Sequence, residues 1–107
     1  MPAKSTTSDQ SFQKLCQLFH LLSDKNRLRM VLMLAEGERN VTDICEALNL
    51  AQPTVSHHLG LLRMNGVIIP KRQGKKVIYT LDPAAGKVSG GKLKFATPPF
   101  GVVIEGF

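Results

Sequence analysis

Residues 41–66 read VTDICEALNLAQPTVSHHLGLLRMNG, and this stretch decides the fold. Its first part places apolar side chains at positions i, i+3, i+4 and i+7, the spacing of one buried face on a short helix. These side chains belong to Val41, Ile44, Cys45 and Leu48. The helix is expected to end at Asn49, because asparagine tolerates the left-handed backbone that a tight turn between two helices requires.

A second helix is expected over residues 52–65, directly after that turn. Leu50 can fill the corner between the two helices, Pro53 is tolerated in the first helical turn, and Gly66 closes the helix together with the residue before it. Three apolar residues recur on the inward face: Val55, Leu59 and Leu62. Two short helices joined by a tight turn indicate a helix-turn-helix motif.

Upstream of this motif, residues 9–22 predict a helix with more apolar surface than a single buried face needs. Its apolar residues are Phe12, Leu15, Cys16, Leu18, Phe19, Leu21 and Leu22. We therefore expect this helix to bury two sides, one of them against a second copy of the chain.

Another helix is expected to begin after the capping residues Ser23 and Asp24 and to end at Glu36, because the next residue, Gly37, stops it. The inward residues at helical spacing are Leu28, Val31, Leu32 and Ala35. The basic residues expected on the exposed face are Lys25, Arg27 and Arg29.

Downstream, residues 67–70 and 77–81 are rich in β-branched side chains and bracket the basic segment 71–76, which contains Gly74. This pattern predicts a β-hairpin with an exposed, charged tip. The expected order is therefore four helices before any strand, then the hairpin. The predicted fold class is mainly α with a small β-hairpin, a winged helix-turn-helix.

The chain changes character after residue 83, where glycine and proline become frequent and make a long helix improbable. We expect residues 86–91 to be flexible and, at most, short strands at 93–96 and 102–105 across the Pro98-Pro99 turn. The expected organisation is a flexible N-terminal arm (1–10), a winged helix-turn-helix DNA-binding domain (11–82) and a tail (83–107). The tail is expected to form a short β-hairpin or a dimerisation element.

Length and composition exclude several classes of protein. The 107 residues suffice for one domain, and two cysteines cannot build a disulfide framework or a four-ligand zinc site. No apolar stretch reaches the ~20 residues that span a bilayer, and the polar start lacks the apolar core of a secretory signal. The sequence also lacks phosphate-binding glycine loops and nucleophile motifs, so we expect no enzyme and no membrane partner.

The positive charge is concentrated in one part of the chain. Residues 63–94 hold eight bases and one acid, a net charge of +7, whereas the rest of the chain sums to −1 within a total of +6. A solvated basic face would explain the excess positive charge. The concentration of this charge in one segment also favours binding to a polyanion such as nucleic acid. The position of the charged residues in the fold must decide between these readings.

Polar and basic residues fall where a winged helix-turn-helix meets DNA. Short polar groups at the start of a recognition helix can bond base edges and phosphates in the major groove, and a basic hairpin tip can reach the neighbouring backbone. In the second helix of the motif, the candidates are Gln52, Thr54, Ser56, His57, His58 and Arg63. In the hairpin they are Lys71, Arg72, Gln73, Lys75 and Lys76.

Four segments together resemble the ArsR/SmtB family of bacterial transcriptional repressors. They read LSDKNRLR (22–29), VSHHLGLL (55–62), GVI (66–68) and RQGKKVIYTL (72–81), and the resemblance covers about residues 12–82. It implies a cytoplasmic homodimer that binds a palindromic double-stranded DNA operator and is released by an inducer, which is a small molecule or a redox signal that the sequence does not name. The residues that match the family's recognition-helix start are 52, 54, 56, 57 and 58, and residues 72–76 match its wing.

The sequence departs from the family at both of its frequent metal sites. The positions of a Cys-x-Cys pair hold Asn40 and Thr42 here, and no histidine follows His58 to form a C-terminal site. We therefore expect no metal and no cofactor in the sites that the family usually builds.

Three other interpretations are open. Cys16 and Cys45 could form a thiol pair that responds to oxidants, although both lie on apolar helical stripes and are expected to pack in the core. His20 lies one helical turn from Cys16 and could join it in a site between subunits, a polar helix edge being the simpler explanation. The chain could also be a winged-helix protein-interaction module that uses its tail.

Overall fold

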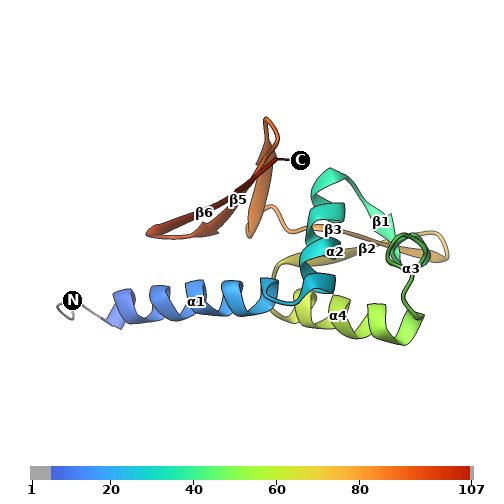
Figure 1. The fold of residues 1–107 in the computed structure, drawn as a ribbon, viewed down its shortest axis with the longest axis horizontal. Coiled ribbons are helices and arrows are strands. Elements are labelled where there is room, and N and C mark those ends of the chain that lie inside the picture. Colours follow the sequence, from blue (N-terminus) through green and yellow to red (C-terminus); the bar gives the residue numbers. More distant parts are fainter. Residues whose placement is uncertain (1–5, 107) are drawn as a thin grey trace.

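The computed structural model describes residues 6–106 and has two small sheets attached to four helices (Figure 1). The helices are α1 (Thr6–Leu22), α2 (Lys25–Glu36), α3 (Val41–Leu48) and α4 (Gln52–Met64). The strands are β1 (Arg39–Asn40), β2 (Ile68–Gln73), β3 (Lys76–Leu81), β4 (Gly86–Ser89), β5 (Lys92–Thr97) and β6 (Phe100–Glu105). The predicted winged helix-turn-helix is confirmed. Within residues 6–106, no helix combines the length and the apolarity needed to cross a membrane.

Helix α1 differs from its prediction at its start. It begins at Thr6, so residues 6–10 are helical and not a flexible arm, and the rest of the predicted arm lies outside the described residues. Leu18, Leu21 and Leu22 are buried, whereas Phe12 and Phe19 are 56% and 55% exposed. The chain's own body therefore buries one side of α1, while the second side, which is expected to pack against another copy of the chain, is exposed in the single chain.

Helix α2 is capped at its N-terminus by Asp24, whose carboxylate Oδ1 accepts hydrogen bonds from the backbone N–H groups of Asn26 (2.9 Å) and Arg27 (3.1 Å). The bond from Arg27 is the main reason why the pKa of Asp24 lies below its ordinary value. The most buried residues of α2 are Met30, Val31 and Leu34, whereas three of the four predicted inward residues, Leu28, Leu32 and Ala35, are only partly buried. Because α2 contacts α1, α3, α4 and β3, its buried arc is wider than one helical stripe.

The core is one continuous cluster of buried apolar side chains that runs from α1 to β5. Ile44, Leu59 and Leu62 contribute from the helix-turn-helix, and Ile68 contributes from the start of the hairpin. Leu93 and Phe95 of β5 complete the cluster, and β5 contacts α1. Part of the tail is therefore built into the core of the winged helix.

Two three-stranded antiparallel sheets flank the helices, and we call them the wing sheet (β1-β3-β2) and the tail sheet (β4-β5-β6). In the wing sheet, Arg39 and Asn40 pair with Tyr79 and Ile78. Strand β1 precedes α3, so the expectation that four helices precede any strand is wrong. A strand of two residues has too few positions to show the alternation that identifies a strand in sequence.

The tail sheet has three strands, although at most two were expected. Strand β4 was missed, and the glycine segment 86–91 is ordered as a strand and a turn. Gly90 and Gly91 have φ values of 58° and 75°, which makes them the two-residue turn between β4 and β5. The expected flexibility of this segment is wrong, because positive φ at two successive glycines is also what a tight hairpin requires.

Candidate nucleic-acid interface

Local hydrogen bonds stabilise the start of α3 and the turn between α3 and α4. Asn40 Oδ1 accepts from the Asp43 N–H (2.8 Å), and Asp43 Oδ2 accepts from the Asn40 N–H (3.3 Å), so two free donors at the start of α3 are satisfied. Asn49 adopts the predicted left-handed conformation (φ 53°, ψ 51°), and the Leu50 N–H donates to the Cys45 carbonyl (3.1 Å). Leu50 packs against the core as predicted. The turn thereby sets the direction of α4.

Helix α4 has one buried face and one polar face. Val55, Leu59 and Leu62 are buried as predicted. The predicted contact residues that are exposed along the helix are Gln52, Thr54, Ser56, His57 and Arg63. Ala51 precedes the helix and makes no side-chain capping bond, so the first-turn N–H groups, except at Pro53, are free to meet an anion.

His58 lies on a different side of α4 from its neighbour. It is half-buried, and its Nδ1 lies 3.4 Å from Arg27 Nη1, whereas His57 is exposed. Arg27 Nε also donates to the Leu21 carbonyl (2.8 Å), one of the unpaired carbonyls at the end of α1. The prediction that Arg27 lies on an exposed face is therefore wrong, because its side chain bridges α1 and α4.

The hairpin after α4, which we call the wing, is longer and has a tighter turn than predicted. Strands β2 and β3 pair as far as Gln73 and Lys76, which leaves Gly74 and Lys75 as a two-residue turn. Gly74 has φ 61°, a backbone conformation that glycine adopts without steric cost. The expected six-residue tip is thus wrong, since most of its residues are in strands. All of its bases are exposed: Lys71, Arg72, Lys75 and Lys76.

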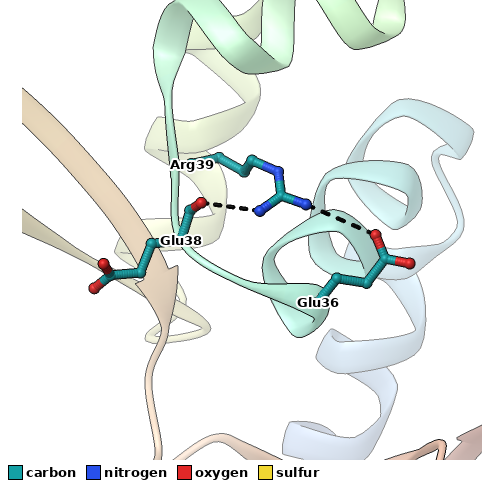
Figure 2. Close-up of polar contacts among 3 residues, drawn as sticks. All are labelled: Glu36, Glu38 and Arg39. Carbon is teal, nitrogen blue, oxygen red and sulfur yellow. Dashed lines mark hydrogen bonds and ion pairs between the residues drawn. The ribbon is translucent and has the colours of Figure 1, made fainter.

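A small ion-pair network that the sequence does not indicate connects the end of α2 with β2, and Figure 2 shows its contacts among Glu36, Glu38 and Arg39. Arg39 lies 3.8 Å from the Glu36 carboxylate and donates to the Glu38 carbonyl (2.9 Å). The Glu38 carboxylate points the other way and pairs with Lys71 of β2 (3.3 Å). The pairing of Glu38 with Lys71 joins residues 33 positions apart, so no local sequence signal indicates it. Among residues 6–106, Arg72, Lys75 and Lys76 form no ion pair.

The fold brings most of the predicted contact residues to one end of the molecule. The start of α4, helix α3 and the turn of the wing lie together at the right of Figure 1, whereas the free end of α1 and the tail sheet lie at the left. Arg63 lies near the opposite end of α4 from this group. The result is a polar helix face beside a basic hairpin.

The structure does not bring the two thiols together. Cys16 is exposed on α1, so its expected core position is wrong, because it lies outside the narrow strip of α1 that contacts the body. Cys45 is half-buried on α3 and packs against the core. Helices α1 and α3 lie on opposite sides of α2 (Figure 1). Within residues 6–106, no three His, Cys, Asp or Glu side chains lie close enough together to hold a metal ion.

A helix-turn-helix with a polar second helix, followed by a basic β-hairpin, defines a winged helix-turn-helix protein. Residues 24–69 match the family described as bacterial regulatory protein, arsR family. The chain is 34% identical to the arsenical resistance operon repressor of Staphylococcus aureus over 74 residues, which is 69% of this chain and 71% of that protein. The chain belongs to the ArsR family.

Two further proteins show how far the similarity extends. The arsenical resistance operon repressor of Escherichia coli is 49% identical over 74 residues, 68% of this chain, and the chain spans less than two thirds of that protein, 63% of its length. A homodimeric winged helix-turn-helix DNA-binding domain from Mycobacterium bovis superimposes with a TM-score of 0.67 at 26% identity, over 77% of this chain and 76% of that domain.

Proposed function

We propose that this chain is a transcriptional repressor that binds double-stranded operator DNA through α4 and the wing. The observation that carries the proposal is the exposed polar face of α4 lying at the same end of the molecule as the bases of the wing. A solvated basic face would not need to adjoin the second helix of a helix-turn-helix. The similarity to two arsenical resistance operon repressors supports the same assignment.

In this proposal, α4 enters the major groove with its N-terminus towards the DNA. The groove is about 12 Å wide and admits one helix. Gln52 and His57 can bond base edges, while Thr54 and Ser56 can bond base edges or phosphates. His58 lies beside Arg27 and supports α4, so its only contact with DNA is with the sugar-phosphate backbone. Arg63 contacts a phosphate beyond the groove.

The wing supplies the electrostatic part of the affinity. Lys71, Arg72, Lys75 and Lys76 neutralise phosphates beside the groove that α4 enters, and Gln73 adds a neutral donor to the same strand end. Each neutralised phosphate releases a counterion, which makes binding weaken as salt rises. Lys71 contributes less than the other bases because Glu38 already pairs with it.

We further propose that the chain acts as a homodimer on a palindromic operator. Phe12 and Phe19 leave an aromatic face of α1 open, and the similar Mycobacterium bovis domain is homodimeric. A two-fold dimer presents two copies of α4 to half-sites about 34 Å, or one helical turn of DNA, apart. The inducer, a small molecule or a redox signal, is unidentified, and Asn40 and Thr42 supply no thiolates for a soft metal. Such a repressor works in the cytoplasm.

The test compares two charge-matched variants. Duplexes that bind the wild-type chain are first selected from random sequence. Arg72→Ala/Lys75→Ala/Lys76→Ala in the wing is then compared with Lys87→Ala/Lys92→Ala/Lys94→Ala in the tail sheet, because each removes three exposed bases. We expect the wing variant to bind at least about tenfold more weakly at ~0.1 M salt, and its log–log salt slope to fall by about 0.9 per lost phosphate contact.

The tail variant should retain both the affinity and the salt slope of the wild-type chain. Equal losses in both variants would show that total charge matters and position does not, which contradicts the proposed interface. A chain that selects no duplex, or one that binds a partner protein at salt concentrations that remove DNA, is a protein-interaction module. Inverted repeats in the selected duplexes would support the palindromic operator.

A further inference from the structure

Strand β6 leaves one edge of the tail sheet open. The strand order is β4-β5-β6, so β6 pairs with β5 on one side and with no described residue on the other. It has six residues, with the apolar run Val102, Val103 and Ile104 at its centre. Val103 is 43% exposed and Phe100 is 36% exposed. An open, apolar edge of this kind is a template for another strand.

Successive residues of a strand direct their main-chain groups to opposite sides, which shows which groups of β6 face the open edge. Gly106, just after β6, donates its N–H to the Gly91 carbonyl on the β5 side (3.4 Å). In an antiparallel pair, every second residue bonds to the same neighbour, so Ile104 and Val102 also bond towards β5. The N–H and C=O groups of Gly101, Val103 and Glu105 therefore point outwards.

The other sheet edges carry features that discourage pairing. Strand β4 has only four residues and includes Lys87. In the wing sheet, β1 has two residues, and β2 contains Pro70 and two bases. Short length, proline and lysine are the devices that keep edge strands from associating. Among the four sheet edges of the described chain, β6 alone combines full strand length with the absence of both proline and lysine.

We propose that β6 pairs antiparallel with β6 of a second copy of this chain, across a two-fold axis at Val103. The strand is self-complementary in this register: Val103 faces Val103, Val102 faces Ile104, and Gly101 faces Glu105 of the other copy. Every outward N–H then finds a carbonyl, and no charged residue faces a like charge. This inference rests on the homodimer proposed above and names the tail as part of its interface.

Val103→Pro tests the pairing at the axis. Proline removes an N–H that faces the open edge, while the bonds from β6 to β5 remain, and proline is tolerated on edge strands. By symmetry, the substitution removes both central hydrogen bonds of the interface. We expect the dimer dissociation constant, measured by sedimentation equilibrium, to rise at least about tenfold. The matched control Val103→Thr keeps the N–H and the β-branched side chain, and should stay within about twofold of wild type.

A second measurement covers the case in which Val103→Pro does not fold. Val103→Cys and Val88→Cys, each in a Cys16→Ser background, place a thiol on the two opposite edges of the tail sheet. A short bismaleimide should cross-link the Val103→Cys chains efficiently and the Val88→Cys chains poorly. A wild-type dimer that Val103→Pro leaves intact, or equal cross-linking of both variants, overturns the strand pairing and leaves the homodimer standing. A monomeric wild-type chain at micromolar concentration overturns both.

Discussion

The wing sheet and the tail sheet are both three-stranded and antiparallel, and each has a glycine-based turn and several exposed bases. They differ in what their strands touch. The wing is a basic hairpin whose turn extends away from the rest of the chain. At its other end, Val67 and Ile68 pack in the core. The tail sheet buries Leu93 and Phe95 beside α1 and leaves a strand edge open. In the proposals made above, similar local architecture therefore contacts DNA in the wing sheet and another copy of the chain in the tail sheet.

The largest expected effect tests whether the tail sheet contributes as much to the stability of the core as the helix-turn-helix does. Leu59→Ala and Leu93→Ala each remove a leucine side chain that is 1% or 0% exposed, the first on α4 and the second on β5. Because both leave a cavity in one continuous core, we expect each to lower the free energy of unfolding by about 2–5 kcal/mol, measured by urea denaturation. A loss below about 1 kcal/mol for Leu93→Ala alone would show that the tail sheet is loosely attached.

A smaller effect, on DNA affinity, tests whether the wing sheet and the tail sheet differ in function. Glu38→Gln and Glu105→Gln each remove one acid that pairs with a lysine, Lys71 in the wing (3.3 Å) and Lys92 in the tail (3.7 Å). We expect Glu38→Gln to raise DNA affinity by a factor of about 1.4 to 5, since an exposed ion pair of this kind is worth about 0.2–1 kcal/mol. Glu105→Gln should leave the affinity unchanged in the same binding titration. An equal gain in both variants would contradict the assignment of DNA contact to the wing and not to the tail sheet.

The smallest effect concerns Asp24, at the start of the helix that packs on both α1 and β3. The pKa of Asp24 is lowered below 3.8 by the Arg27 N–H, so its charged form stabilises the folded chain above that pH. This stabilisation is lost as the pH falls through the lowered pKa. Asp24→Asn keeps a capping oxygen but cannot ionise. We expect the difference in melting temperature between wild type and variant to shrink on acidification, and a constant difference would exclude the carboxylate as its source.

The predictions from sequence were most accurate where the signal is local. The helical periodicity of Ile44 and Leu48, the left-handed Asn49 and the inward Leu59 all depend on residues within two helical turns. The predictions were wrong where distant segments meet. Cys16 lies on an apolar stripe and is expected in the core, but too little of the rest of the chain contacts α1 to bury it.

The candidate site divides in the same way. The sequence alone determines a helix-turn-helix whose second helix carries polar residues, and a basic hairpin after it, because periodicity, turn residues and β-branched runs act over a few positions. Packing between distant segments decides that Arg27 holds His58, across 31 positions, that Glu38 neutralises Lys71, and that β5 completes the core beside α1. Such contacts form only once the chain has folded, since each depends on the position of a partner far away in the sequence.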